Sequence, residues 1–364
     1  MTKQQVLFIG DLNHSLPEFE KFQSKYECLE YTLTTRDQFI ADLKTKFSNI
    51  SAIYGAWLGF VPIGGFRTVI DYAPSSLKVL AFCSVGYDHQ DANELAQRGI
   101  VMTNVPSVGA AEPVSDLVVY FTITGFRQLH MYGKQKLLKI PDTIEIRYKF
   151  ANGEFSQKEG QLNLASGRGY DFGEKINQRP NLSPRGHNAV IVGFGQIGQL
   201  IGKKLNQLGM NITYVKRSKL NKEQEDALGY EATYFSTILD AAKKGDVDLI
   251  VIACPATPET HHLIDETVIG SIPKPFRIIN IGRGTVIDEQ ALLNGLDSGK
   301  ILFAGLDVFE NEPAINERLI NRDDVVLTPH IGASTSENFD YTAIKALENI
   351  DNILEGGAGI NKVN

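Results

Sequence analysis

The feature that most constrains the fold is a repeated alternation of short apolar runs with longer stretches of helical character. Between residues 189 and 327 the runs are Ala189–Val192, Ile212–Val215, Leu249–Ala253, Arg277–Ile281, Phe303–Leu306 and Val325–Leu327. Apolar runs of this length, separated by helices, are typical of parallel strands buried on both faces. We therefore predict an α/β fold with a doubly wound parallel sheet in this part of the chain.

A second, shorter series of the same kind precedes it. Its predicted strands are Val6–Ile9, Ala52–Tyr54, Val79–Phe82 and Val101–Thr103. Apolar residues at helical spacing predict a long helix over Glu112–Met131 and another over Ser334–Leu354, which would return to the first unit. A chain of 364 residues is long for one domain, and we predict one domain from 1–108 with 334–364 and another over 109–333.

Composition limits the classes of partner and compartment. A net charge of −7 gives no reason to expect nucleic acid or an acidic membrane surface as partner. The cysteines Cys28, Cys83 and Cys254 are widely spaced and flanked by apolar residues, so we expect buried thiols rather than a disulfide framework or a metal site. The sequence contains no run of membrane-spanning length and nothing like a signal peptide, so we expect a cytoplasmic protein.

An irregular segment over 133–187 separates the two series. In it Ile144, Ile146, Tyr148 and Phe150 alternate with charged residues, and an Asn-Gly turn signal follows at 152–153. This period of two predicts a β-hairpin arm, either a solvated surface hairpin or a contact between subunits.

The sequence Gly193-Phe194-Gly195-Gln196-Ile197-Gly198 fits the GxGxxG pattern, which alone is weak evidence. Its context is stronger, because a predicted buried strand precedes it and an amphipathic stretch, Leu200–Leu208, follows it. In such a turn the first glycine permits the tight bend, the second lets a pyrophosphate approach, and the third allows helix–sheet packing. We predict a dinucleotide site rather than a purely structural turn.

The next predicted strand ends without the acid that would bind the ribose 2′-hydroxyl of NAD. Lys216, Arg217 and Ser218 stand there instead. An acid repels a 2′-phosphate, whereas these side chains can hold one, so we predict NADP(H) as the preferred cofactor, with NAD(H) possible. The alternative is a pair of solvated basic residues beside an unselective pocket.

Polar residues also follow three later predicted strands, at the carboxyl ends, where open α/β sheets bind ligands. Arg283, Glu312 and His330 can together anchor a carboxylate and pass a proton, if Glu312 orients the His330 ring and raises its pKa. Each residue alone has an ordinary structural interpretation. Three at corresponding strand ends, downstream of a dinucleotide loop, favour catalysis.

On these motifs the chain resembles the D-isomer-specific 2-hydroxyacid dehydrogenase family, most strongly over 189–333. The stretches that carry the resemblance are Val192–Gly198, Cys254–Ile264, Asn280–Asp288, Gly305–Pro313 and Thr328–Gly332. Among its members, the chain looks most like fungal glyoxylate/hydroxypyruvate reductases and D-mandelate dehydrogenases.

The resemblance implies roles for individual residues. It gives Arg283, Glu312 and His330 the catalytic roles. It places cofactor contacts in the glycine loop (Gly193, Gly195, Gln196, Ile197 and Gly198) and at Cys254, Pro255, Thr260, Ile281, Gly282, Asp307, His330 and Gly332. It places substrate contacts at Arg283 and at the loop Ser84-Val85-Gly86-Tyr87-Asp88, where the backbone N–H groups of Val85 and Gly86 would hold the carboxylate.

The family architecture implies two Rossmann-like or flavodoxin-like domains with the active site in the cleft between them, and a homodimer. We expect the substrate side chain near Tyr54 and Trp57, although either residue can equally belong to the core. The chain departs from the family in the missing acid after the second strand and in the long 133–187 segment.

The expected reaction is hydride transfer from NADPH to a small 2-oxo acid such as glyoxylate, hydroxypyruvate or pyruvate, with His330 as general acid. Two alternatives stay open, an aromatic 2-oxo acid of the D-mandelate type and a dinucleotide-sensing scaffold with little turnover. Related formate dehydrogenases pair the histidine with glutamine, so Glu312 argues against formate as substrate.

Overall fold

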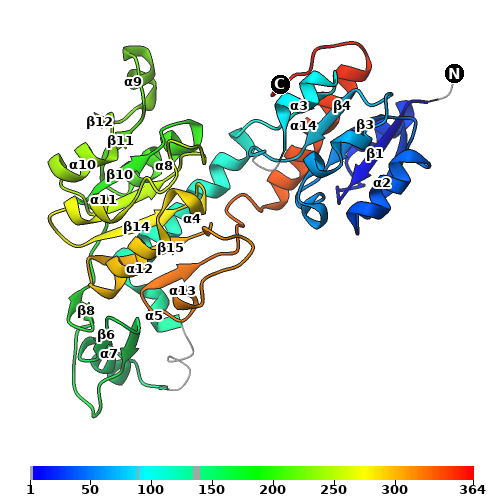
Figure 1. Cartoon of the computed structure of the whole chain (residues 1–364). Helices are drawn as coiled ribbons and strands as arrows, with labels where there is room; N and C mark the ends of the chain where they lie inside the picture. Colours follow the sequence, from blue (N-terminus) through cyan, green and yellow to red (C-terminus); the bar gives the residue numbers. More distant parts are fainter. Residues whose placement is uncertain (1–2, 88–89, 134–139) are drawn as a thin grey trace. The chain divides into compact units, whose positions relative to one another are not determined.

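The computed structural model describes residues 3–87, 90–133 and 140–364. It separates into two compact units, Met1–Ala110 with Ser334–Asn364 (unit 1) and Ala111–Ala333 (unit 2). Both units are parallel α/β structures (Figure 1), as the apolar runs predicted.

Unit 1 is built on a five-stranded sheet in the order β2-β1-β3-β4-β5, with all strands parallel. Its elements are β1 (Gln5–Ile9), α1 (Pro17–Lys25), β2 (Glu27–Tyr31), α2 (Arg36–Lys44), β3 (Ile50–Gly55), three 3₁₀ turns (Val61–Ile63, Phe66–Thr68 and Ile70–Tyr72), β4 (Val79–Phe82), α3 (Ala92–Gln97), β5 (Val101–Thr103) and α14 (Ser336–Leu354).

The alternation of side chains along each strand divides the unit 1 core into two layers. Val6 and Phe8 of β1 pack with α1 and with α14, whereas Leu7 and Ile9 pack with α2 on the opposite face. The helix α14 is therefore part of the core of unit 1, although more than 200 residues separate it from β5.

Unit 2 is built on a seven-stranded parallel sheet in the order β12-β11-β10-β13-β14-β15-β16. Its elements are α4 (Val108–Arg127, which begins in unit 1), α5 (Leu129–Gly133), α7 (Thr143–Ala151), β6 (Glu154–Ser156), β7 (Gln161–Asn163), β8 (Lys175–Ile176), β9 (Arg179–Pro180), β10 (Asn188–Val192), α8 (Gln196–Gln207), β11 (Asn211–Val215), α9 (Lys222–Leu228), β12 (Ala232–Phe235), α10 (Ile238–Lys244), β13 (Leu249–Ile252), α11 (Glu266–Ser271), β14 (Phe276–Asn280), a 3₁₀ turn (Gly284–Val286), α12 (Glu289–Asp297), β15 (Ile301–Leu306), α13 (Glu317–Ile320) and β16 (Val325–Leu327).

Helices cover both faces of this sheet. Alternate residues of β10 enter different clusters: Ala189 and Ile191 pack with α4 and α8, whereas Val190 and Val192 pack with α10, α11 and α12. The chain runs outward from β10 in both directions, through β11 on one side and β13 on the other. The crevice at such a reversal of strand order is where doubly wound folds bind ligands.

Two strands of the large parallel sheets, β2 and β12, were not predicted. Both are edge strands of their sheets, and none of their residues is fully buried. An edge strand has a neighbour on one side only, so its sequence lacks the continuous apolar run that identifies a central strand.

The predicted β-hairpin over 144–155 was wrong. Residues Thr143–Ala151 form α7, whose N-cap Asp142 accepts hydrogen bonds from the N–H groups of Ile144 and Glu145. Ile146 and Phe150, four residues apart, are buried on one face of this helix, while Ile144 is 48% exposed. Residues that alternate with a period of two also include pairs four residues apart, which lie on one face of a helix. The pattern therefore fitted both structures, and the N-cap at Asp142 favours the helix.

A short hairpin does occur directly after α7, where β6 pairs with β7. It packs on its own unit, since Gln157 donates to the carbonyl of Leu296 (2.7 Å) and Asp323 accepts from the N–H of Leu162 (2.8 Å). Part of the predicted arm, 134–139, lies outside the described residues. Among the helices that are described, none is long and apolar enough to cross a membrane.

Candidate active site

The glycine turn after β10 has the geometry of a phosphate-binding loop. Gly193 has φ +93°, and a Cβ there would meet the backbone of Cys254 at 2.6 Å. A Cβ at Gly198 would meet the carbonyl oxygen of Gly193 at 2.2 Å, whereas one at Gly195 would meet no atom within 4 Å. The first and third glycines are thus required by packing, and the second faces open space.

The N-terminus of α8 is available to an anion at this turn. The helix begins at Gln196, and its N-cap is Gly195, which has no side chain to accept from the first-turn N–H groups. These groups and the positive end of the helix dipole favour a phosphate. The residues present therefore fit the pyrophosphate of a dinucleotide.

The basic residues that follow β11 lie next to this turn. The N–H of Gly193 donates to the carbonyl of Val215 (3.0 Å), so Lys216 directly follows a residue bonded to the glycine loop. Lys216 is half-buried, and Arg217 and Ser218 are exposed. Within the part of the chain that is described, no carboxylate lies within 4.0 Å of Lys216 or Arg217.

The structure brings Glu312 and His330 into contact. The Nδ1 atom of His330 lies 2.9 Å from Oε2 of Glu312, and Oε1 of Glu312 accepts from the N–H of Phe309 (2.9 Å). Arg283 follows β14, and its Nη1 donates to the carbonyl of Gly282 (2.8 Å). Its positive charge lowers the pKa of both Glu312 and His330, which places all three in one electrostatic neighbourhood.

The hydrogen bond with Glu312 raises the pKa of His330, and this effect exceeds the opposing effect of partial burial. Burial raises the pKa of Glu312, but hydrogen bonds from His330 and from Phe309 outweigh it, so the pKa of Glu312 is lowered overall. The pair therefore favours an ionised carboxylate beside a protonated imidazole. This leaves Nε2 of His330 as the nitrogen able to donate to a ligand.

Asp307, which follows β15, holds the turn that carries His330. Its Oδ1 accepts from the hydroxyl of Thr328 (2.6 Å) and the N–H of Ile331 (2.9 Å), and its Oδ2 accepts from the N–H of Gly332 (2.8 Å). His330 has φ +54°, a left-handed conformation that is rare for a residue with a Cβ. The three hydrogen bonds to Asp307 compensate for this local strain.

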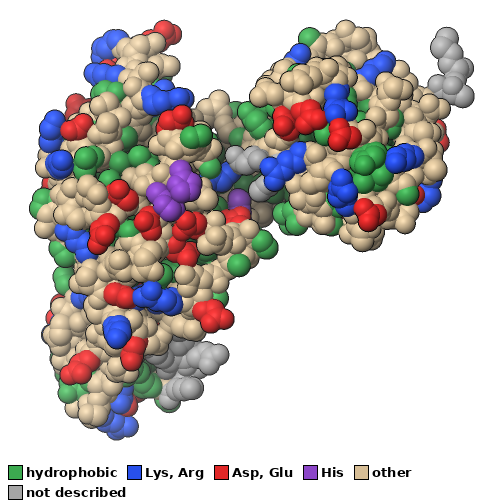
Figure 2. Space-filling model, in the orientation of Figure 1, with side chains coloured by type: hydrophobic (Ala, Val, Ile, Leu, Met, Phe, Trp, Pro, Cys, Tyr) green, Lys and Arg blue, Asp and Glu red, His purple; other side chains and the backbone are tan. Residues whose placement is uncertain are grey.

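The structure also contains a second histidine–carboxylate pair that the sequence did not indicate, formed by His262 and Glu310. Nε2 of His262 lies 2.5 Å from Oε1 of Glu310, and Oε2 of Glu310 accepts from the N–H of Glu289 (3.2 Å) at the start of α12. Figure 2 shows histidine side chains next to acidic ones on one face of unit 2. The only signal in the sequence is that Glu310 is two residues from Glu312.

The Glu310 segment also packs directly on the Arg283 segment. A Cβ at Gly284 would meet the carbonyl carbon of Phe309 at 1.9 Å and the nitrogen of Glu310 at 2.4 Å. Only glycine can stand at position 284 without moving one of the two loops. Because Arg283 precedes it, this contact fixes the place of the guanidinium relative to the Glu312 loop.

The other predicted cofactor residues lie on the loops that follow β13 and β14. Cys254 is buried, which raises the pKa of its thiol to about 11, and Gly282 packs against its carbonyl oxygen. The hydroxyl of Thr260 donates to the carbonyl of Pro255 (2.8 Å) and so closes the loop after β13. Ile281 is half-buried at the end of β14.

The predicted substrate residues other than Arg283 belong to unit 1. Neither the N–H of Val85 nor that of Gly86 has an acceptor among the residues that the structure describes, and both residues are half-buried. Asp88 of this loop lies outside the described residues. Tyr54 is 1% exposed and its ring stacks on Phe8 with centroids 4.8 Å apart. This position favours the core alternative for Tyr54, while Trp57 is half-buried at the edge of the same cluster.

Comparison with known proteins agrees with this geometry. The family model described as the NAD binding domain of D-isomer specific 2-hydroxyacid dehydrogenases matches residues 155–332. The chain is 30% identical to 4-methyl-2-oxopentanoate reductase A of Aspergillus oryzae, over 98% of this chain and 97% of that one.

Solved structures show the same likeness. The holo form of Rhodotorula graminis D-mandelate dehydrogenase matches with a TM-score of 0.85 and 30% identity, over 100% of this chain and 98% of that chain. An NADPH-dependent glyoxylate/hydroxypyruvate reductase of Sinorhizobium meliloti, in complex with NADP and malonate, matches with a TM-score of 0.75 and 25% identity, over 100% and 97% of the two chains. The chain belongs to the D-isomer specific 2-hydroxyacid dehydrogenase family. It is therefore an oxidoreductase with a binding domain for a nicotinamide dinucleotide.

Proposed function

We propose that this protein reduces a small 2-oxo acid to the D-2-hydroxy acid with NADPH, using His330 as the general acid. The observation that carries the proposal is the 2.9 Å contact between His330 and Glu312, with the charge of Arg283 acting on both. These groups follow the carboxyl ends of strands in the sheet that also bears the glycine turn after β10.

Each residue has a distinct task in this proposal. The bound dinucleotide supplies the hydride. Arg283 binds the substrate carboxylate and lies near the ketone oxygen, where its charge favours the developing alkoxide. His330 donates the proton from Nε2 to that oxygen, and Glu312 keeps the imidazole protonated and oriented through Nδ1.

The assignment of NADP(H) rests on the residues after β11. Lys216, Arg217 and Ser218 offer two cationic groups and a hydroxyl, and the described residues provide neither cation with an ion-pair partner. A 2′-phosphate would supply that partner. The Sinorhizobium meliloti relative is NADPH-dependent by its description, which agrees with this assignment.

Substrate recognition is proposed to involve unit 1. The N–H groups of Val85 and Gly86 have no acceptor among the described residues, as a carboxylate-binding loop requires, and the half-buried Trp57 would contact the substrate side chain. We assign Tyr54 to the core instead. The substrate-binding domain would then be unit 1 and the cofactor-binding domain unit 2.

A second candidate is an aromatic 2-oxo acid, because the D-mandelate dehydrogenase of Rhodotorula graminis is among the most similar structures. The Aspergillus oryzae relative is a 4-methyl-2-oxopentanoate reductase, so a branched aliphatic acid belongs in the same comparison. A scaffold that binds the dinucleotide without turnover is disfavoured by the hydrogen-bonded Glu312–His330 pair.

Association into a homodimer in the cytoplasm completes the proposal. Tyr170 and Phe172, in the long segment before β8, are 77% and 74% exposed. Two neighbouring exposed aromatics are typical of a contact surface. The cytoplasmic location rests on the three cysteines, all of which are free thiols.

The test is a set of initial rates with NADPH and NADH against glyoxylate, hydroxypyruvate, pyruvate, 4-methyl-2-oxopentanoate and phenylglyoxylate. We expect turnover of at least one acid, faster with NADPH at low cofactor concentration. Preference for phenylglyoxylate would establish the aromatic alternative. Tight cofactor binding with no turnover of any acid would contradict the enzymatic proposal and support the scaffold.

A further inference from the structure

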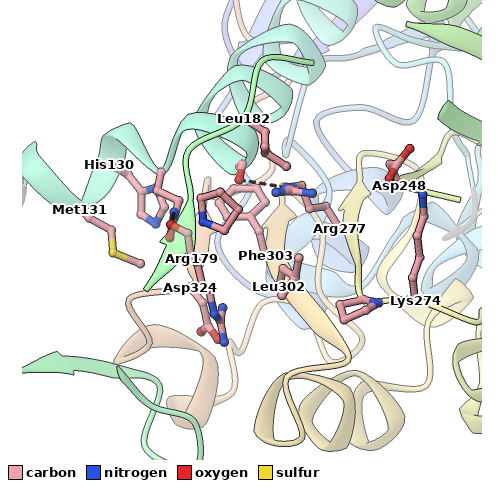
Figure 3. A pocket seen from close by; sticks show the side chains of 14 residues that line it. His130, Met131, Arg179, Leu182, Asp248, Lys274, Arg277, Leu302, Phe303 and Asp324 are labelled. Atoms are coloured by element: carbon pink, nitrogen blue, oxygen red, sulfur yellow. Dashed lines mark hydrogen bonds and ion pairs between the residues drawn. The ribbon is translucent and has the colours of Figure 1, made fainter. Parts of the chain in front are cut away.

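A cavity of about 280 Å³ lies at the amino ends of the strands in the unit 2 sheet (Figure 3). Asp248 immediately precedes β13, Arg277 is the second residue of β14, and Phe303 is in the first half of β15. Because these strands are parallel, their amino ends lie on the side of the sheet opposite their carboxyl ends, which bear Arg283 and His330. The cavity is therefore separate from the candidate active site.

The walls of the cavity are largely apolar. They include Met131, Pro180, Leu182, Pro275, Leu302 and Phe303. Its volume is just below the usual range for small-molecule sites, which suits a ligand smaller than a typical drug. Apolar walls alone do not indicate which class of ligand binds. The charged side chains that line the same cavity give that information.

Two arginines line the cavity without an internal counterion. Arg277 is 7% exposed, its Nε donates to the carbonyl of Gly125 (3.0 Å), and its guanidinium lies 4.0 Å from the ring centroid of Phe126. Arg179 donates to the side-chain oxygen of Gln157 and lies over the ring of Phe155 at 5.0 Å. Among the residues described, neither guanidinium has a carboxylate within 4.0 Å.

The two carboxylates in the wall are already engaged. Asp248 lies 2.6 Å from Nζ of Lys274 and accepts from the N–H of Asn188 (2.9 Å). Asp324 lies 2.8 Å from Nε of Arg322. Lys274 also pairs with Asp246, and Arg322 also pairs with Asp297 (2.6 Å), so both wall carboxylates are held by other cations and neither forms an ion pair with Arg179 or Arg277.

The electrostatic effects on Arg277 agree with this count of charges. Burial is the main cause that lowers the pKa of Arg277 to about 10; the charge of Asp248 opposes this effect, and the charge of Arg179 adds to it. A buried cation is costly unless an anion accompanies it. The site is therefore prepared for a negative group next to an apolar one.

We propose that this cavity is a second ligand site that binds a small organic monocarboxylate. Its carboxylate accepts hydrogen bonds from Arg277 and Arg179, and its apolar body packs against side chains such as Met131 and Phe303. Planar guanidinium groups match a carboxylate. The apolar walls favour an organic acid over an inorganic anion, which would lose hydration there without apolar contacts.

Benzoate is a suitable probe, and its binding to the full-length protein can be measured by titration calorimetry. We expect saturable binding that Arg277→Met and Arg179→Gln each weaken at least tenfold. Arg179 is only half-buried, so its variant keeps the test valid if Arg277→Met fails to fold. The exposed Arg168 is not among the residues lining the cavity, and Arg168→Gln should bind benzoate as the wild type does.

Three comparisons identify the site and the ligand class. Benzamide, the neutral analogue, should not bind, and inorganic phosphate should bind much more weakly than benzoate. Arg283→Gln should leave benzoate binding unchanged, because Arg283 follows the carboxyl end of β14 and the cavity lies at the amino ends of the strands. Loss of binding in Arg283→Gln, equal affinity for phosphate, or unchanged binding in both cavity variants would overturn the proposal, as would the absence of binding to the wild type.

Discussion

Nδ1 of His330 lies 2.9 Å from Oε2 of Glu312, and this contact sets the protonation of the proposed general acid. Reduction requires a protonated imidazole, and the hydrogen bond with Glu312 raises its pKa. The acid form therefore persists to a higher pH than in an isolated histidine.

In Glu312→Gln the raising effect is lost, so the pKa of His330 falls. We expect the alkaline limb of the pH profile for reduction to move to lower pH, and the acidic limb for hydroxyacid oxidation to move the same way. In His330→Ala kcat should fall by about 10²–10⁴ at every pH. Initial rates from pH 5 to 10 in both directions measure this. An unchanged profile in Glu312→Gln would mean that another group supplies the proton.

Asp307→Asn tests the turn that carries His330. The amide can still accept at one oxygen but presents an NH₂ group in place of the other. The N–H of Gly332, which donates to Oδ2 of Asp307, would then lose its acceptor. An unsatisfied buried donor costs about 1–3 kcal/mol, so we expect that loss in the free energy of unfolding, together with a lower kcat. Urea titration and initial rates measure the two effects.

Thr328→Val is the matched control for Asp307→Asn. It removes the hydroxyl donor to Asp307 but leaves the N–H bonds of Ile331 and Gly332 in place. Its cost should be smaller, about 1 kcal/mol. If the two variants are equally stable, Asp307 does not hold the turn as described.

Gly284→Ala tests the packing of the Arg283 segment on the Phe309–Glu310 backbone. The new Cβ would fall 1.9 Å from the carbonyl carbon of Phe309, so the two loops must separate. Displacing a catalytic group by about 1 Å can cost about 10²-fold in rate, and we expect kcat/KM to fall by that order. Gly270→Ala is the control, because a Cβ there meets nothing within 4 Å. Retained activity in Gly284→Ala would show that this contact is not needed.

The cofactor assignment predicts a selective effect. Replacing Lys216 and Arg217 together by alanine should raise the KM for NADPH and leave the KM for NADH unchanged, because only NADPH carries the 2′-phosphate. Lys219→Ala is a control that removes one positive charge close by in the sequence, from a lysine already paired with Glu225 at 3.1 Å. Equal losses for both cofactors would rule out a 2′-phosphate contact.

The dimer proposal is tested at the exposed aromatics of the long segment. Tyr170→Ser with Phe172→Ser should shift the sedimentation coefficient from dimer to monomer at micromolar concentration. Neither ring is part of the buried core, so the variant should still fold. Ile360→Ser, which changes an exposed apolar residue of unit 1, should leave the sedimentation unchanged. A wild type that sediments as a monomer would refute the homodimer itself.

The sequence predicted the central strands well because their burial on two faces demands continuous apolar runs. The run Val325–Leu327, for example, is β16 without any change of bounds. The edge strands β2 and β12 are not buried on both faces, so they have no continuous apolar run and were not predicted. The α7 segment was predicted as a hairpin because Ile146 and Phe150 satisfy a period of two as well as a helical spacing of four.

The candidate site shows a similar division. Arg283, Glu312 and His330 were chosen because each follows a predicted strand, and the structure brings Glu312 and His330 together. The His262–Glu310 pair and the bonds of Asp307 to the His330 turn depend on how separate loops pack. No local pattern encodes such packing, so a single sequence does not show it.

The place of α14 in the core of unit 1 has a consequence for biosynthesis. A ribosome completes β1 to β5 within the first 103 residues, but the helix that covers one face of their sheet ends only at Leu354. All strands of unit 2 are made in between. During translation the first sheet made is thus the last to be fully covered, and its apolar face must wait, exposed or held by a chaperone, while the second sheet folds.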